Sequence, residues 1–595
     1  MLSSFRFLYL GLSPFDEFCF RVQNICSICW SNLTNGQGQA IFTAECSHSF
    51  HYHCIANNVQ HGNLCCPACR AKWNKNNLPF QVPPLQQNNK SKHGFADDEP
   101  LSSATLLKTS GPQNVTVKTH TETSAISAAE SRPHYPVLVS ICAPPLQDPD
   151  GEGRTPIDLV TILDVSGSML GQKLELVKQA VKFVIENMGT SDRLSIVSFS
   201  TTSKRLLPLR RMTVKGRESA IQAVESLRAD GGTDIAEGLK IGTHILEERR
   251  ERNPVASIIL LSDGQDNHCD NPSQMLKKLP ASIRSSDMQH EIPVHTFGFG
   301  NDHDAKIMHA ISNVSGGTFS YIESVGIIQD AFALCIGGLL SVVAQELRFT
   351  VRSASPGVKI VEIPSGRHVS QISDEQGVVD VGNMYAEEEK QFLVYLSVPQ
   401  SAAPDTKTSL VDVLCVYKDL GSDEFIPVQG EKVEITRPDF CSPAEMAVSL
   451  EVDRQRNRLL VADAIGEAQR LAEMGNLEAA RAVLTQRRET LMTSTAAKAG
   501  DDLSHMFETE LKQIMDKMAS MNLYEEVGRA YALSGMSSHA RQRASARGNA
   551  AGSCLADKAG RKQLATKAAG RATFETPAMV RMVRKSQNKR KSGSK

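Results

Sequence analysis

Ile162-Leu163-Asp164-Val165-Ser166-Gly167-Ser168 joins the end of an apolar strand to the start of an amphipathic helix, and this stretch decides the fold of the chain's central part. Around it, from Pro136 to Leu347, short apolar runs alternate with segments of helical periodicity. The predicted strands are 159–163, 194–199, 257–261 and 294–299, and the predicted helices are 173–188, 217–227, 235–246 and 305–311. This alternation predicts a doubly wound parallel α/β sheet that is covered on both faces.

Three loops place short oxygen-bearing side chains at the carboxyl edge of this predicted sheet, where open α/β sheets bind ligands. The residues are Asp164, Ser166 and Ser168 in the first loop, Thr233 in the second and Asp263 in the third. Hydroxyl and carboxylate oxygens suit a hard divalent cation, so the pattern predicts a site for Mg²⁺ or Mn²⁺. Alternatively, the two serines only cap the helix that follows them.

The three loops resemble the metal-ion-dependent adhesion site of von Willebrand A domains. The resemblance implies that the three hydroxyl residues bind the cation directly, and that the two aspartates bind it directly or through water. It also implies an open coordination position, which an acidic side chain of a partner fills. A hydrolytic enzyme would need more carboxylates and a nearby nucleophile or base, and His268 and His303 lie in loops without a convincing triad.

Eight of the 14 cysteines fall within the first 69 residues, which indicates a local metal site in a reducing compartment. The closely spaced ligand pairs are Cys26 with Cys29, Cys46 with His48, His51 with Cys54, and Cys66 with Cys69. Zn²⁺ takes four thiolate or imidazole ligands, so eight ligands predict two ions. A single DNA-binding finger of two cysteines and two histidines would use His51 and His53, whose spacing is too short, and would leave four cysteines over.

The order and gaps of these ligands resemble the RING finger of the two-histidine subtype, in which the ligand pairs interleave. The resemblance implies one zinc ion on Cys26, Cys29, His51 and Cys54, and the other on Cys46, His48, Cys66 and Cys69. In RING ligases an apolar residue and a proline form the surface that grips a ubiquitin-conjugating enzyme, and a basic residue bridges that enzyme and ubiquitin. The matching residues here are Ile28, Pro67 and Arg70. Asn57 and Asn58 stand where many RING fingers carry a tryptophan.

Changes in composition and periodicity divide the chain into seven expected parts. They are an N-terminal extension (1–22), the zinc finger (23–75), a flexible polar linker (76–132), the von Willebrand A-like α/β domain (133–347), a small β-sandwich (348–440), an α-helical region (441–535) and a basic disordered tail (536–595). The sandwich is expected because its apolar residues alternate, and the helical region because its apolar stripes break at Gly475-Asn476.

The order of these parts, together with 95–100 and 248–257, resembles the plant "wavy growth" group of RING ubiquitin ligases. The resemblance implies a ubiquitin-protein transferase that acts in root gravitropism. Its implied partners are a ubiquitin-conjugating enzyme that carries ubiquitin and an unidentified protein substrate. The rival interpretation is a non-catalytic scaffold that binds partners through zinc and Mg²⁺. Residues 561–569 resemble a core histone tail, but nine residues of low-complexity sequence can also recur by chance, and a solvated basic tail is the favoured interpretation. Nucleic acid is therefore not expected as a partner, except through this tail.

The sequence also bears on the cellular compartment of the protein. It has no apolar run long enough to cross a bilayer, and its first residues lack the features of a secretory signal. We therefore expect a cytoplasmic protein without a membrane partner, with the basic tail as a candidate nuclear address.

Overall fold

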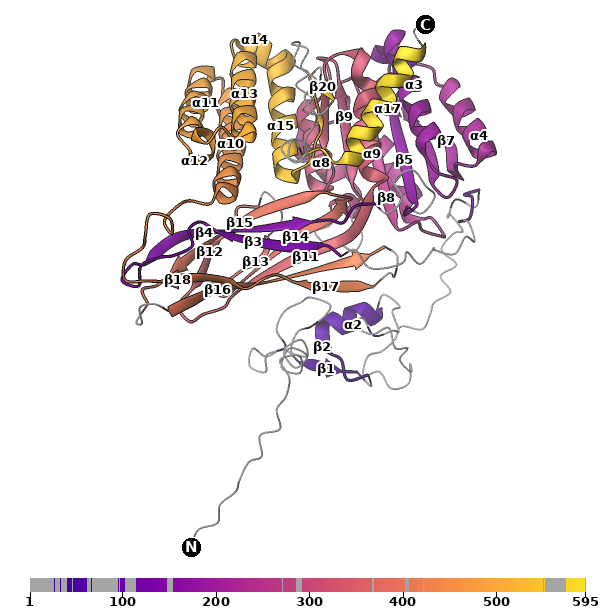
Figure 1. Cartoon of the computed structure of the whole chain (residues 1–595). Helices are drawn as coiled ribbons and strands as arrows, with labels where there is room; N and C mark the ends of the chain where they lie inside the picture. The colour runs from indigo at the N-terminus through magenta and orange to yellow at the C-terminus, as the bar shows by residue number, and fades with distance from the viewer. Residues whose placement is uncertain are drawn as a thin grey trace. The chain divides into compact units, whose positions relative to one another are not determined.

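The computed structural model divides the chain into two compact units, Met1–Lys92 and His93–Lys595, which are drawn in Figure 1. In the first unit the structure describes Cys26, Leu33, Cys66 and residues 40–60 except 45. In the second it describes residues 95, 97–101, 114–146, 154–269, 271–284, 292–365, 369–401, 406–420, 422, 424–548, 550–551 and 574–593. The predicted extension 1–22 lies outside the described residues.

The first unit contains a small hairpin followed by a helix. Strands β1 (Ile41–Thr43) and β2 (Ser49–His51) pair antiparallel, and α2 (Tyr52–Gln60) begins at the next residue. Phe50, Ile55 and Val59 form its apolar core together with three buried cysteines. A core this small needs additional support, which metal ligands supply in small domains.

The α/β part of the second unit is an eight-stranded sheet of order β20-β19-β10-β9-β8-β5-β6-β7. The strands are β5 (Ile157–Asp164), β6 (Arg193–Phe199), β7 (Ser203–Arg211), β8 (Val255–Ser262), β9 (Val294–Phe299), β10 (Phe319–Ile322), β19 (Ala546–Gly548) and β20 (Ala550–Ala551). Strands β5, β6, β8, β9 and β10 run parallel, whereas β7 is antiparallel. After β5 the chain adds β6 and β7 on one side of it, and then β8, β9 and β10 on the other side. The carboxyl ends of β5 and β8 therefore form the topological switch point.

Helices cover both faces of this sheet, as the continuous apolar strands predicted (Figure 1). Helices α3 (Gln172–Asn187), α4 (Val214–Glu225) and α9 (Ile328–Leu339) pack against one face. The other face carries α5 (Ile235–Glu247), α6 (Pro272–Lys278), α7 (Ala281–Arg284) and α8 (Ala305–Val314). The predicted doubly wound α/β fold is confirmed.

The β-sandwich consists of two facing sheets, of order β13-β14-β11-β16-β17, with β18 beside β16, and β12-β15-β4-β3. The first contains β11 (Val342–Ser353), β13 (Val369–Ile372), β14 (Gln376–Tyr385), β16 (Thr406–Asp419), β17 (Phe425–Gln429) and β18 (Val433–Arg437). The second contains β3 (Thr116–Thr121), β4 (Arg132–Cys142), β12 (Lys359–Glu362) and β15 (Glu389–Val398). Because β3 and β4 precede the α/β domain in sequence, that domain is inserted into the sandwich.

Two predicted boundaries are therefore wrong. Residues 114–132 were predicted to belong to a flexible linker, but β3 lies at the edge of the sandwich, where its polar residues face solvent. Residues 133–142 were predicted to belong to the α/β domain, but they form β4. Val139 points into the sandwich core while Leu138, on the opposite face, is covered by Val452 of the helical region. Because both faces of β4 are covered, its apolar residues lie on both faces. A continuous apolar run is the pattern expected of a strand in a parallel sheet, so the sequence pattern assigned β4 to the α/β domain.

The helical region contains α10 (Leu450–Glu473), α11 (Leu477–Met492), α12 (Thr495–Lys498), α13 (Asp502–Lys517), α14 (Met521–Leu523) and α15 (Arg529–Arg541). Gly475 has φ of 79° and Asn476 caps α11 by accepting a 3.0 Å hydrogen bond from the Ala479 N–H. The break predicted at this pair thus separates α10 from α11. Except for α12, these helices share one apolar core with α8, as the packing in Figure 1 illustrates.

The predicted disordered tail from residue 536 is wrong for the part of it that the structure describes. Strand β19 adds parallel to β10, and α17 (Pro577–Gly593) packs on α9. The prediction relied on the basic composition of this segment and overlooked a narrow apolar stripe within it. Met579 and Val583 belong to this stripe and are buried. The histone-like stretch 561–569 lies outside the described residues. Of the helices that the structure describes, none combines the length and hydrophobicity needed to cross a membrane.

Candidate functional site

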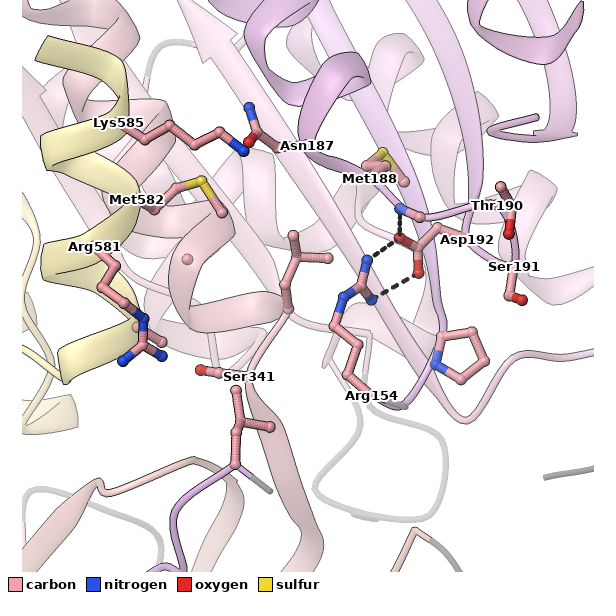
Figure 2. Close-up of a pocket in the computed structure, with 16 residues that line it drawn as sticks. Arg154, Asn187, Met188, Thr190, Ser191, Asp192, Ser341, Arg581, Met582 and Lys585 are labelled. Atoms are coloured by element: carbon pink, nitrogen blue, oxygen red, sulfur yellow. Dashed lines mark hydrogen bonds and ion pairs between the residues drawn. The ribbon is translucent and has the colours of Figure 1, made fainter. Parts of the chain in front are cut away.

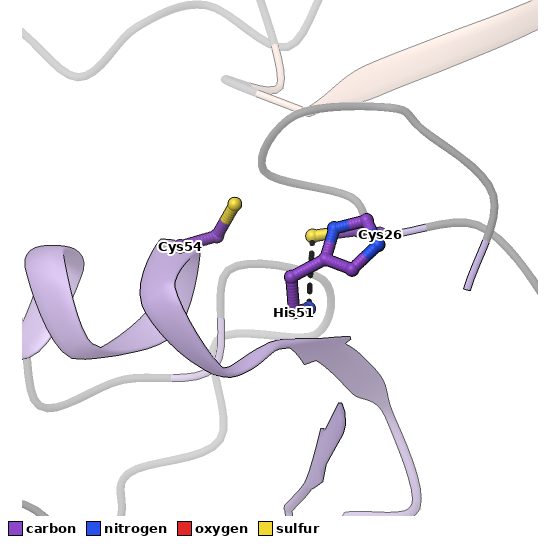
Figure 3. Close-up of side chains that lie close together, drawn as sticks. All are labelled: Cys26, His51 and Cys54. Atoms are coloured by element: carbon purple, nitrogen blue, oxygen red, sulfur yellow. Dashed lines mark hydrogen bonds between the residues drawn. The ribbon is translucent and has the colours of Figure 1, made fainter. Parts of the chain in front are cut away.

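The finger brings its ligand side chains together at the corner where β2 ends and α2 begins. In Figure 3 the side chains of Cys26, His51 and Cys54 approach one another, and their ligand atoms lie within 4.8 Å of each other. The His51 N–H also donates a 3.4 Å hydrogen bond to Cys26 Sγ. His51 is the last residue of β2, and Cys54 lies in the first turn of α2.

A second group forms from the intervening ligands. The ligand atoms of Cys46, His48 and Cys66 also lie within 4.8 Å of one another. The first group thus combines Cys26 with two residues that come after Cys46 in the chain, and the second combines Cys46 with the later Cys66. The two groups interleave along the sequence, as the RING resemblance implied. Thiolates and imidazoles in such groups fit Zn²⁺. The fourth ligand predicted for each ion, Cys29 or Cys69, lies outside the described residues.

The remaining finger residues divide between the described and undescribed parts. His53 Nε2 lies 3.2 Å from Cys54 Sγ, and its ring stacks on that of His51 with centroids 5.5 Å apart. It therefore packs beside the first ligand group. The predicted enzyme-contact residues Ile28, Pro67 and Arg70 lie outside the described residues.

The candidate cation site in the α/β domain starts at the end of β5. Asp164 is fully buried there, and its two carboxylate oxygens accept hydrogen bonds from the Ser166 N–H at 2.8 Å and the Ser262 hydroxyl at 2.6 Å. Burial raises the pKa of Asp164, and the neighbouring charge of Asp263 raises it further although these hydrogen bonds lower it. A cation placed beside this carboxylate would favour its charged form.

The four other predicted ligands converge on the same point. The hydroxyls of Ser166 and Ser168 lie 3.0 Å apart, and Ser168 donates a 2.6 Å hydrogen bond to Asp263 Oδ1. A Cβ on Gly264 would lie 3.0 Å from Thr233 Oγ1 and 3.7 Å from Ser168 Oγ, so this glycine leaves room for both hydroxyls. Two carboxylates and three hydroxyls at the switch point make a donor set that fits Mg²⁺ or Mn²⁺.

The alternative role of the serines as helix caps does not match their contacts. Ser166 is the N-cap residue of the short 3₁₀ helix at Gly167–Met169, but its side chain makes no capping hydrogen bond. Ser168 donates instead to Asp263. Their hydroxyls are therefore oriented toward the oxygen cluster.

Lys173, the second residue of α3, also contacts this cluster, and sequence reasoning missed it. Its Nζ lies 2.5 Å from Asp263 Oδ2, and the aspartate is fully buried whereas about a third of the lysine side chain is exposed (31%). A cation in the first turn of a helix is unfavourable unless it has an acidic partner. That rule is the one sequence signal that could have identified Lys173 as part of the site.

The two histidines near these loops differ in burial and in partner. The pKa of His303 is lowered to about 4 by burial, and its ring packs against Tyr321 with centroids 5.5 Å apart. His268 is exposed and faces Asp234 across 3.6 Å.

Three segments of the chain match known protein families. Residues 26–55 match the RING-like zinc finger family, 158–333 match the von Willebrand factor type A domain, and 501–588 match a family described as VWA / Hh protein intein-like. A solved von Willebrand factor type A protein from Catenulispora acidiphila has a TM-score of 0.53 at 19% identity, covering 68% of this chain and 91% of that one. This likeness concerns the fold.

Three curated relatives from Arabidopsis thaliana match most of the chain. E3 ubiquitin-protein ligase WAV3 is 31% identical over 85% of this chain and 76% of its own length. E3 ubiquitin-protein ligase WAVH1 is 30% identical over 79% and 71%, and probable E3 ubiquitin-protein ligase WAVH2 is 30% identical over 82% and 73%. With a RING-like finger, a von Willebrand A domain and this extent of similarity, the chain belongs to the WAV3 family of RING-type E3 ubiquitin-protein ligases.

Proposed function

We propose that this ligase works by division of labour: the finger recruits a ubiquitin-conjugating enzyme, and the von Willebrand A domain binds the protein that receives ubiquitin. The observation that carries the proposal is the interleaving of the two Cys/His groups, which in a member of this family is the scaffold of a RING surface. As a further part of the proposal, we assign the protein a role in the direction of root growth and place it in the cytoplasm, with the basic tail as a candidate nuclear address.

The finger's contribution is positional. Two Zn²⁺ ions, held by the eight ligands named above, would fix the loops that carry Ile28, Pro67 and Arg70. Isoleucine and proline would contact the conjugating enzyme, and the planar guanidinium would hold that enzyme and ubiquitin together. Zinc with four protein ligands has no open position, so its role is structural.

The thiol that carries ubiquitin belongs to the conjugating enzyme in this proposal. Two cysteines of the second unit support this assignment, because burial raises the pKa of both Cys335 and Cys415 to about 12. A thiol with such a pKa is almost entirely protonated at neutral pH and is a poor nucleophile.

The von Willebrand A domain would contribute recognition. The oxygen cluster of Asp164, Ser166, Ser168, Thr233 and Asp263 would hold Mg²⁺ or Mn²⁺, and an acidic side chain of the partner would complete its coordination. The support for this assignment is the convergence of the five side chains at the switch point of the sheet.

The test is an autoubiquitination assay of the purified full chain with a panel of conjugating enzymes. Wild type should form ubiquitin conjugates with at least one enzyme, and Cys66→Ser should not, because it removes a ligand of the second zinc group. Ile28→Asp should also lose transfer while retaining two zinc ions per chain by metal analysis, since its side chain is not a ligand.

Full activity of Ile28→Asp would refute the assigned contact surface. Wild type that holds two zinc ions but forms no conjugates with any enzyme of the panel would favour a non-catalytic scaffold. Zinc content of one ion or none would contradict the interleaved assignment itself.

A further inference from the structure

A cavity of about 310 Å³ lies where the C-terminal helix α17 meets the α/β domain. Figure 2 shows Arg581, Met582 and Lys585 of α17 on one side, and Arg154 with Asp192 on the other. The end of α3, the loop that leads from it to β6, and the end of α9 with the two residues after it contribute further to the wall. This volume is at the lower end of the roughly 300–1,000 Å³ typical of small-molecule sites.

The cavity carries a net positive charge. Arg154 Nη1 donates a 2.9 Å hydrogen bond to Asp192 Oδ1, and its Nη2 pairs with the other carboxylate oxygen. Asp192 also accepts backbone N–H groups of Ile157 and Gly189, so this buried carboxylate is fully satisfied and its charge is balanced. Among the residues that the structure describes, neither Arg581 nor Lys585 forms an ion pair with an acidic side chain. Two positive charges therefore remain for a ligand.

Asn187, the last residue of α3, adds an acceptor to these cations. Its Nδ2 donates a 2.7 Å hydrogen bond to the Phe183 carbonyl oxygen, whereas its buried Oδ1 has no hydrogen-bond partner among the described residues. A buried acceptor without a partner is costly and is expected to receive a donor. Met188, Leu340 and Met582 provide apolar surface beside it.

We propose that this cavity binds a small hydroxylated phosphate monoester, such as a sugar phosphate. A phosphate monoester carries a charge of about −1.5 to −2 at neutral pH, which matches the two unpaired cations. A hydroxyl of the ligand donates to Asn187 Oδ1, and its carbon skeleton packs on the apolar surface. The site is separate from the cation cluster and from the finger ligands, and the proposal does not rest on the ligase function.

The ligand would connect α17 to the end of α3 and the loop after it, because its phosphate contacts the helix and its hydroxyl contacts Asn187. Binding should then stabilise the docked position of α17. This consequence gives a structural readout that is independent of affinity.

The test measures binding of glucose 6-phosphate to the purified full chain by titration calorimetry, with glucose and inorganic phosphate as comparison probes. Wild type should bind the sugar phosphate more tightly than either comparison probe. Hydrogen exchange of 577–593 should slow when glucose 6-phosphate is added, and not with glucose.

Matched variants locate the site. Lys585→Gln should weaken binding on the order of tenfold, because a charge-assisted contact is lost. Arg584→Gln removes an exposed cation from the same helix but not from the cavity, and it should bind as wild type does. Asn187→Leu should weaken binding of glucose 6-phosphate and leave that of inorganic phosphate unchanged.

Three outcomes would overturn the proposal. They are no measurable binding of glucose 6-phosphate to wild type, equal affinity of Lys585→Gln and wild type, and equal affinity for glucose 6-phosphate and inorganic phosphate. In the last case the cavity would not recognise the hydroxylated part of an ester.

Discussion

Lys173 places an ammonium group against one of the two carboxylates proposed to hold a divalent cation. Its Nζ is 2.5 Å from Asp263 Oδ2, and Ser168 occupies the other oxygen. A divalent cation in the cluster would be repelled by this ammonium and would compete with it for the same carboxylate. Lys173 should therefore limit the affinity of the site.

The prediction is that Lys173→Gln tightens binding of Mn²⁺ or Mg²⁺ by at least about tenfold, since two like charges a few ångströms apart repel appreciably even near a protein surface. Titration calorimetry of the full chain measures it. Lys182→Gln is the matched control, because that lysine lies on the same helix but pairs with Glu225 at the surface. Equal affinities of Lys173→Gln and wild type would show that the lysine does not limit cation binding.

For single residues, the sequence predicts those functional side chains that belong to a local motif. The five oxygen ligands could be predicted because each follows a strand or stands in a glycine-containing loop, and the topology of a parallel sheet brings such loops together. The position of Lys173 in the first turn of a helix indicates that it has an acidic partner, but not that this partner is Asp263, which lies 90 residues further along the chain. Side-chain pairs of this kind depend on the packed structure.

Among the elements, β4 and α17 show why pattern alone misplaces a segment. Periodicity reports whether a face is apolar but not which neighbour covers it. Leu138 makes β4 look like a strand of the α/β sheet because α10, more than 300 residues further along the chain, covers it. Helix α17 is mostly basic, and its small apolar stripe becomes sufficient only because α9 offers a surface with no side chains at two adjacent glycines.

The close approach of α17 to α9 leads to a second prediction. A Cβ on Gly337 would lie 2.9 Å from Met579 Cα and 3.0 Å from the Ala578 carbonyl oxygen, both of which are backbone atoms. Gly337→Ala should therefore push α17 away and destabilise the protein by about 1–3 kcal/mol, the usual cost of overpacking. Thermal unfolding and the rate of proteolytic cleavage within 577–593 measure the effect.

Gly466→Ala is the matched control for this substitution. Gly466 also lies inside a helix, α10, but the nearest atom to its Cβ position is the flexible end of Met536 at 3.8 Å. Alanine is the better helix former, so this variant should be neutral or slightly stabilised. Equal behaviour of the two variants would mean that α17 does not depend on close packing at Gly337.

On the scale of the whole molecule, a buried ionic cluster joins the helical region to strand β19 of the α/β sheet. Glu510 of α13 pairs with Arg547 of β19, and its other carboxylate oxygen lies 3.1 Å from His539 Nε2 of α15. Burial alone would raise the pKa of Glu510, but the charges of Arg547 and His539 lower it to well below its usual range. A carboxyl group with a depressed folded-state pKa stabilises the fold at pH values above its unfolded-state pKa.

Glu510→Gln should accordingly destabilise the protein by about 3 kcal/mol at pH 7, because it leaves a buried arginine without its charged partner. The difference from wild type should shrink as the pH falls below about 4.3, the unfolded-state pKa of glutamate, since the wild-type carboxylate then loses its advantage. Denaturant unfolding at several pH values measures this. Glu508→Gln, which breaks more exposed pairs with Arg488 and Lys512, should cost about 1 kcal/mol or less. A constant effect of Glu510→Gln from pH 7 to pH 3 would contradict the assigned charge.

The two compact units have separate apolar cores, and this separation underlies the last prediction. Asp164→Ala combined with Ser166→Ala removes two oxygen ligands from the α/β domain without touching a residue of the finger. The double variant should lose metal-dependent capture of a partner and still synthesise unanchored ubiquitin chains at the wild-type rate, because the finger's zinc ligands lie in the other unit.

Pull-down from plant extract in the presence of Mg²⁺ or a chelator, run beside a chain-synthesis assay, measures both. Chelation should reduce capture by wild type and have little further effect on the double variant. Identical partners for both proteins with and without Mg²⁺ would show that substrate choice lies in the sandwich or the helical region instead.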